Sequence, residues 1–133
     1  MKITRLDHLV LTVRDIPRTV AFYTTILGMS EVLFADGRTA LSFGNQKINL
    51  HQSAHEFDPK AANPTPGSAD LCLISETPIE TVVAELKSHA IEIVEGPVFR
   101  TGACGSILSV YLRDPDENLI EVSNYQESKL MPK

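Results

Sequence analysis

Five polar residues stand in segments that are otherwise apolar, and their side chains suit metal or acid–base chemistry: His8, Asn49, His51, Asp70 and Glu121. Imidazole nitrogens together with carboxylate oxygens are the ligands that a borderline divalent ion such as Zn²⁺, Ni²⁺, Mn²⁺ or Fe²⁺ accepts. Each residue alone indicates little, because a single His in a strand is more often a core or edge residue than a ligand. A Glu near a C-terminal strand is likewise usually solvent-facing. The equivalence of their positions is what makes the set informative.

His8 and Asp70 occupy equivalent places in two segments that read as strands. Side chains alternate between the two faces of a strand, so the neighbouring residues assign each side chain a face. In residues 7–13, apolar side chains at every second position mark the face that a helix covers, and His8 lies on the other face. In residues 69–74 two leucines do the same, which leaves Asp70 on the other face.

Asn49 and Glu121 form a second equivalent pair. The tripeptides 48–50 and 120–122 both read apolar, polar, apolar, so their central residues superpose in a repeat. His51 lies two residues beyond Asn49 and shares its face. The pattern therefore predicts that all five polar side chains lie on concave faces opposite the helices.

The first half of the chain reads β-α-β-β-β. Asp15 is a suitable N-cap, and the apolar residues that follow recur at helical spacing until Gly28, which predicts a helix between them. One strand precedes this helix and three short strands follow it, at residues 7–13, 31–34, 39–43 and 47–51.

The second half repeats that order. Thr77-Pro78-Ile79-Glu80 carries a capping box with proline at the first helical position, which predicts a helix that continues to Ala90. The predicted strands are residues 69–74, 92–94, 107–112 and 119–123. The two halves therefore form an internal structural repeat.

We expect an α+β domain over residues 1–133, made of two tandem βαβββ modules whose sheets curl into half-cups with the helices outside. The modules span about residues 4–51 and 69–125, with a linker at 52–68 and a C-terminal tail at 126–133. A linker of this length is a functional lid, a crossover, a hinge or a plain connector, and the sequence leaves these alternatives open.

Composition limits the classes of partner. The net charge is −5 and Lys and Arg form no cluster, which argues against nucleic acid or a membrane as partner. The apolar stretches are far shorter than a membrane span. Two cysteines are too few for a disulfide framework, and Cys72, in an apolar strand, is expected to be a small buried side chain. We expect a reduced, cytoplasmic protein.

Two stretches carry a family signature. Residues 7–15, with Phe22-Tyr23 and Leu27-Gly28 after them, resemble the opening module of the glyoxalase/bleomycin resistance/dioxygenase superfamily, also called vicinal-oxygen-chelate proteins. Residues 114–122, Asp-Pro-Asp-Glu-Asn-Leu-Ile-Glu-Val, resemble the closing motif of that superfamily. Three further segments look most like glyoxalase domain-containing protein 5: residues 47–51, 66–70 and 100–103. The chain as a whole is also similar to glyoxalase I (lactoylglutathione lyase)-like proteins.

The resemblance implies a divalent metal ion as cofactor. His8 and Glu121 match ligand positions of the metal-binding members. Asn49 stands where glyoxalase I has a carboxylate, and Asp70 stands where it has a His; Asp is a competent ligand, whereas Asn binds only weakly. We therefore expect His8, Asp70 and Glu121 as ligands, with His51 as a fourth ligand or close neighbour.

The same resemblance implies an enzyme of the glyoxalase I kind, a lyase of methylglyoxal detoxification. Such an enzyme isomerises the hemithioacetal formed from glutathione and a 2-oxoaldehyde. Glu121 is the expected catalytic carboxylate, which moves the proton between neighbouring carbons. Asn49 and Arg100 are the expected substrate-binding residues, although Arg100 also reads as a solvated loop charge.

Three alternatives remain open. One is thiol or water addition to an epoxide, as in fosfomycin-resistance relatives. A ring-cleaving dioxygenase is less favoured, because its iron site requires two His and one carboxylate while Asp70 occupies the second His position. The third is a non-catalytic small-molecule-binding module, as in bleomycin-binding relatives.

We expect a homodimer, because relatives with two modules per chain commonly pair, either by edge contact or by exchanging modules across the 52–68 linker. Sedimentation equilibrium at micromolar concentration should therefore give twice the 14.6 kDa mass of the chain. A single species at the mass of one chain would contradict this expectation.

Overall fold

The computed structural model describes residues 1–126, so the expected tail at 126–133 lies almost wholly outside the described residues. The chain divides into two compact units, which we describe separately. The first contains residues 1–69 together with 115–117, and the second contains residues 70–114 together with those from 118 onward. No helix among the described residues is long and apolar enough to cross a membrane.

The first unit is a four-stranded mixed sheet with one helix. Its elements, in chain order, are β1 (His8–Val13), α1 (Ile16–Thr25), β2 (Ser30–Phe34), β3 (Arg38–Phe43) and β4 (Gln46–Gln52). The strand order is β1-β4-β3-β2, in which β1 runs parallel to β4 and the other pairs are antiparallel. A parallel pair needs a long connection, which α1, β2 and β3 provide here.

Local signals explain where α1 begins and how it packs. Asp15 caps the helix, because its Oδ1 accepts a hydrogen bond from the backbone N–H of Arg18 at 3.1 Å. Gly28 lies just beyond the helix with φ +70°, a conformation that glycine adopts without strain. The buried face of α1 carries Thr19 and Tyr23, and the helix packs on β2, β3 and β4. The helix predicted between Asp15 and Gly28 is confirmed.

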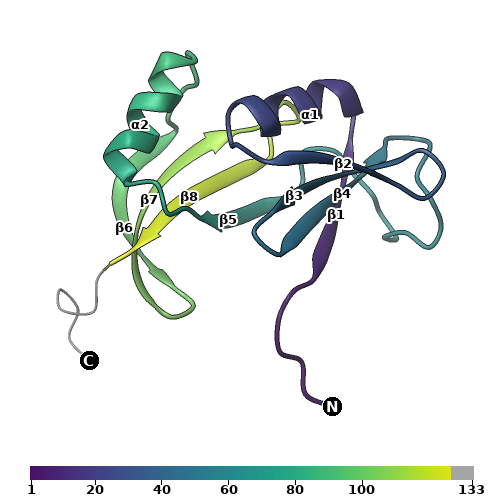
Figure 1. The fold of residues 1–133 in the computed structure, drawn as a ribbon, viewed down its shortest axis with the longest axis horizontal. Helices are drawn as coiled ribbons and strands as arrows, with labels where there is room; N and C mark the ends of the chain where they lie inside the picture. The colour runs from purple at the N-terminus through teal and green to yellow at the C-terminus, as the bar shows by residue number, and fades with distance from the viewer. Residues whose placement is uncertain (127–133) are drawn as a thin grey trace. The chain divides into compact units, whose positions relative to one another are not determined.

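The second unit has the same order of elements. They are β5 (Asp70–Ile74), α2 (Ile79–Ser88), β6 (Glu95–Gly102), β7 (Gly105–Arg113) and β8 (Leu119–Tyr125), with strand order β5-β8-β7-β6. Again the first and last strands pair in parallel, and α2 packs on β7. Figure 1 shows one helix beside each four-stranded sheet, so the predicted α+β fold with two βαβββ modules is confirmed.

Two local predictions for the second unit are wrong. Thr77 does not cap α2: Pro78 occupies the N-cap position, and no side chain there accepts a hydrogen bond from the first turn. The backbone oxygen of Thr77 instead accepts a hydrogen bond from Nδ2 of Asn124 at 2.9 Å, which holds the loop before the helix. The strand predicted at 92–94 instead spans Glu95–Gly102. A register shift after Glu95 lets β6 continue through a Gly-Pro pair that reads as a turn.

The strand registers confirm the equivalence of the two halves. Asn49 lies beside Val10 in the first sheet, and Glu121 lies beside Cys72 in the second. His8 begins β1 two residues before Val10, just as Asp70 begins β5 two residues before Cys72.

The first unit also includes residues 115–117, which come from later in the sequence. Asp116 is buried, and its Oδ1 accepts a hydrogen bond from the backbone N–H of Arg14 at 3.0 Å. Gly67, at φ +84°, passes so close that a Cβ there would lie 2.6 Å from the backbone oxygen of Asp116. Only a residue without a side chain fits at that point.

Replacing Gly67 by Ala should therefore destabilise the protein strongly. Gly37→Ala is the matched control, because Gly37 has φ +76° but nothing within 4 Å of an added Cβ. We expect a loss of about 1 kcal/mol for Gly37→Ala from backbone strain alone. Gly67→Ala should lose about 3 kcal/mol, since backbone must also move. Equal urea-unfolding free energies for the two variants would contradict the close approach.

Candidate functional site

The predicted site residues fall into both units. The first unit carries three of them and the second carries the others: His8, Asn49 and His51, then Asp70, Arg100 and Glu121. Within residues 1–126, neither unit by itself groups three His, Cys, Asp or Glu side chains so that they could hold a metal ion. The individual side chains nevertheless differ in which of their polar atoms are already hydrogen-bonded within the protein.

Among residues 1–126, one ring nitrogen of His8 has no hydrogen-bond partner. Its side chain is 44% exposed, and Nδ1 lies 2.9 Å from Oδ1 of Asp7. This hydrogen bond is the main reason why the pKa of Asp7 is lowered. Metal-binding histidines commonly use one nitrogen on a carboxylate in this way, so that the other faces the ion. His8 therefore fits a metal ligand through Nε2.

His51 is differently placed. His51 is buried, with only 3% of its surface exposed, and its Nε2 lies 3.2 Å from Nη2 of Arg38. Because a guanidinium has only donors, His51 accepts this bond and carries its proton on Nδ1. Burial and the charge of Arg38 lower the pKa of His51, which favours the neutral ring. The nitrogen that a metal would need is thus already occupied.

Asn49 is a buried polar residue with an unmatched acceptor. It is 6% exposed, and its Oδ1 has no hydrogen-bond partner among the described residues. A buried acceptor left unpaired costs about 1–3 kcal/mol. The side chain is therefore retained at some cost to stability, which is typical of a position with a functional role.

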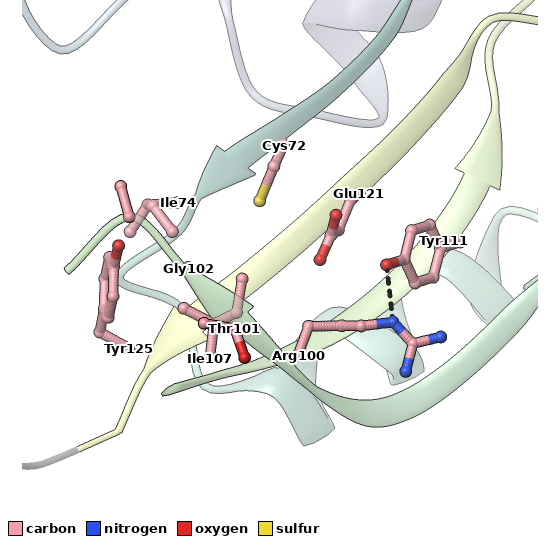
Figure 2. Close-up of a pocket in the computed structure, with 10 residues that line it drawn as sticks. Cys72, Ile74, Arg100, Thr101, Gly102, Ile107, Tyr111, Glu121 and Tyr125 are labelled. Carbon is pink, nitrogen blue, oxygen red and sulfur yellow. Dashed lines mark hydrogen bonds between the residues drawn. The ribbon is translucent and has the colours of Figure 1, made fainter. Parts of the chain in front are cut away.

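The second unit contains a pocket of about 530 Å³ on the face of its sheet. Figure 2 shows the side chains that line it, which come from β5, β6, β7 and β8. Glu121, Arg100 and Tyr111 supply polar groups, while the remaining walls include Ile74, Ile107 and Tyr125. The pocket thus combines a polar region with an apolar one, as small-molecule sites commonly do.

Glu121 is held by two serines through one of its oxygens. Oε2 accepts a hydrogen bond from Oγ of Ser109 at 2.6 Å, and Oγ of Ser123 lies 3.4 Å from the same oxygen. Both serines are fully buried. The hydroxyl of Tyr111 and the thiol of Cys72 also interact with this carboxylate. The carboxylate is therefore fixed in orientation on the pocket wall.

Cys72 completes this hydrogen-bonded chain. Ser109 donates its hydroxyl hydrogen bond to the carboxylate, so its oxygen accepts a hydrogen bond from Ser123 at 2.6 Å. Ser123 in turn can accept from the thiol of Cys72, whose Sγ lies 3.3 Å away. Desolvation of the sulfur raises the pKa of Cys72, and the charge of Glu121 raises it further. The thiol is consequently protonated and lies in the pocket wall.

The expectation that Cys72 is buried is wrong. The residue is exposed, because β5 is an edge strand and α2 covers only the opposite face of the sheet. Ser109, Tyr111 and Ser123 were also missed by sequence reasoning. The signal for them was present, since Ser109 and Tyr111 alternate along β7 on one face.

Arg100 has its charge largely satisfied by the protein. Its Nη2 lies 2.7 Å from Oε2 of Glu95, and its Nε donates to the hydroxyl of Tyr111 at 3.1 Å. These hydrogen bonds raise the pKa of Arg100, that with Tyr111 contributing most. Figure 2 shows the guanidinium beside Tyr111 on the pocket wall. Arg100 is therefore positioned as a hydrogen-bond donor more than as an unbalanced charge.

Asn49→Leu should raise stability, because an apolar side chain of similar size removes the unpaired acceptor. We expect the free energy of unfolding to increase by about 1 kcal/mol, measured by urea denaturation without ligand. Asn63→Leu is a suitable control, because Asn63 is exposed and such changes stay within about 0.5 kcal/mol. A clear loss of stability in Asn49→Leu would show that the acceptor is satisfied.

Comparisons with known proteins agree with this architecture. Virulence protein STM3117 of Salmonella typhimurium is 62% identical over 125 residues, covering 94% of this chain and 87% of that protein. Its crystal structure matches with a TM-score of 0.93 over 95% of this chain and 100% of that chain. Glyoxalase domain-containing protein RDO1 of Mycosarcoma maydis is 56% identical, covering 97% of this chain and 73% of that protein.

A more distant structure shares the fold alone. Lactoylglutathione lyase from Agrobacterium tumefaciens matches with a TM-score of 0.71 at 21% identity, covering 97% of each chain. The family model described as Glyoxalase/Bleomycin resistance protein/Dioxygenase superfamily matches residues 5–122. With nearly the whole chain matched and both βαβββ modules present, this protein belongs to the glyoxalase/bleomycin resistance/dioxygenase superfamily.

Proposed function

We propose that this protein is a metal-dependent enzyme of the glyoxalase I kind, which isomerises the hemithioacetal of glutathione and a 2-oxoaldehyde. The observation that carries the proposal is the carboxylate of Glu121 on the pocket wall. The hydroxyl of Ser109 holds one of its oxygens, so the carboxylate keeps a constant position on that wall. The RDO1 relative is named a glyoxalase domain-containing protein, which supports the glyoxalase part of this proposal.

Glu121 has the chemistry that proton transfer between neighbouring carbons requires. A carboxylate accepts the proton from the carbon beside a carbonyl and returns it to the next carbon. The bond from Ser109 prevents the side chain from rotating away, and the buried serines exclude water from behind it. Arg100 and Tyr111 present hydrogen-bond donors on the same wall.

The proposed ligands of the divalent ion are His8, Asp70 and Glu121. His8 fits because Nε2 is free and Asp7 orients the ring, and the two carboxylates supply oxygen donors. We leave His51 out of the set, because Arg38 already occupies its Nε2. A divalent ion bound there would supply Lewis-acid chemistry, polarising the vicinal oxygens of the substrate.

A binding module without catalysis is the second candidate. It is favoured by the absence, within the part of either unit that the structure describes, of three grouped metal donors. The apolar side chains of Ile74, Ile107 and Tyr125 would then hold a ligand in the same pocket. Activity assays with glutathione hemithioacetal, fosfomycin and catechols separate the three enzyme reactions from this alternative.

Glu121→Gln and His8→Ala should each abolish activity while leaving the fold intact. We expect hemithioacetal isomerisation to fall by about 10²–10⁴-fold in Glu121→Gln, because an amide cannot act as a base. Both variants should also lose metal, by elemental analysis after dialysis.

The control is Glu85→Gln, a change of the same kind on the exposed side of α2. It should match the unmodified protein in activity and metal content. Unchanged metal content in both His8→Ala and Glu121→Gln would mean that the metal site is elsewhere or absent. Retained activity in Glu121→Gln would remove the proposed base.

A further inference from the structure

A cluster of two cations and two aromatic rings lies in the first unit. The guanidinium carbon of Arg38 is 5.3 Å from the ring centre of Phe34 and 4.6 Å from that of Phe57. The ammonium of Lys47 is 3.9 Å from the ring centre of Phe34. We call Phe34, Arg38, Lys47 and Phe57 the cation–aromatic cluster. Phe57 comes from the segment after β4, and the other three residues come from β2, β3 and β4.

The strand registers place this cluster on the same face as His8 and Asn49. Arg38 pairs with Phe34 across β2 and β3, and its guanidinium donates a hydrogen bond to the ring of His51 on β4. Lys47 shares a face with Asn49 and His51, because it lies two and four residues before them on β4. The buried residues Ile48 and Leu50 occupy the other face. The cluster therefore belongs to the polar face of the first sheet.

The two cations have no carboxylate partner among residues 1–126. No salt bridge of Arg38 or Lys47 lies within the described residues, although the chain as a whole has a net charge of −5. The carboxylate of Glu56, which influences His51, is engaged by Lys60 at 3.6 Å and by the backbone N–H of Ala54 at 2.8 Å. Neither cation therefore has a direct ion pair among residues 1–126, and the carboxylate of Asp7 acts on Lys47 only through its longer-range charge.

Arg100 provides an informative contrast. Its guanidinium donates to a carboxylate, a phenol and a backbone carbonyl, so an incoming anion would compete with Glu95. Arg38 donates only to the neutral ring of His51 within the described residues, which leaves four of its five N–H groups for a ligand. The rings on both sides hold the guanidinium in place, so little side-chain entropy remains to be lost on binding.

We propose that the cation–aromatic cluster binds a carboxylate of the small-molecule ligand, with Arg38 and Lys47 as the countercharges. The proposal rests on the proposed function in one respect: the ligand that we assign is a glutathione conjugate, which ends in a glycine carboxylate. The planar fork of Arg38 matches the two oxygens of such a group, and Lys47 adds a point charge. Arg100 then acts as a hydrogen-bond donor in the other unit, not as the receptor of this carboxylate.

The test uses S-hexylglutathione, a stable conjugate, and its diethyl ester, which lacks both carboxylate charges. Binding is measured by calorimetry for the unmodified protein, Lys47→Met and Arg38→Gln. Lys47→Met preserves the apolar stem over Phe34, so it remains informative if Arg38→Gln disturbs folding. Lys87→Met, on the exposed side of α2, is the matched control for loss of one positive charge.

We expect Lys47→Met and Arg38→Gln each to bind S-hexylglutathione about tenfold more weakly, as for loss of a hydrogen bond to a charged group. Their affinity for the diethyl ester should equal that of the unmodified protein, and Lys87→Met should be unaffected with both ligands. Unchanged binding of S-hexylglutathione in both cluster variants would overturn the proposal, as would equal loss of affinity for acid and ester.

A second probe separates this proposal from the proposed function. N-acetylglycine carries only the amide and carboxylate that end glutathione, and its binding can be followed by NMR shifts of the Arg38 and Lys47 side chains. If S-hexylglutathione fails to bind but N-acetylglycine shifts these signals, the cluster stands and the glutathione substrate does not. If neither probe shifts them, the cluster is not a carboxylate site.

Discussion

Each sheet of this protein is covered by one helix, and one helix covers only one face. Alternation along the strands must therefore send every second side chain into the core and the others onto the open face. Ile120 and Val122 are buried beneath the helix side, and Glu121 between them lies on the pocket wall. A slip of one residue would bury the carboxylate and expose both apolar side chains, at a cost far above any gain in the open site. The core thus positions the site.

The two strongest candidate ligands share a common arrangement. In His8 and Glu121 alike, a neighbouring side chain orients the functional group through one polar atom: Asp7 holds Nδ1 of His8, and Ser109 holds Oε2 of Glu121. Such hydrogen bonds fix the orientation of a functional group. His51 differs from His8, because Arg38 donates a hydrogen bond to its Nε2, the nitrogen that we assign to the metal in His8. Residue type alone does not distinguish these three cases.

Charge balance distinguishes the two units. In the second unit, the carboxylate of Glu95 balances the positive charge of Arg100 in an ion pair. In the first, Arg38 and Lys47 are held by aromatic rings, which orient a cation without neutralising it. An unneutralised cation in an acidic chain raises the local concentration of small anions.

Periodicity within single strands was enough to predict the βαβββ order, the helix between Asp15 and Gly28, and the equivalence of Asn49 with Glu121. These features depend on neighbours a few residues apart, so a single segment contains the information. The start of β6 and the cap of α2 were wrong, because a bulge and the distant side chain of Asn124 decide them. Ser109, 12 residues from Glu121, and Arg38, 13 residues from His51, could be matched to their partners only once strand pairing was known. The sequence by itself determined which face each side chain takes; the tertiary structure decided which polar atoms are already engaged, because hydrogen bonds across a sheet depend on register between strands that periodicity does not encode.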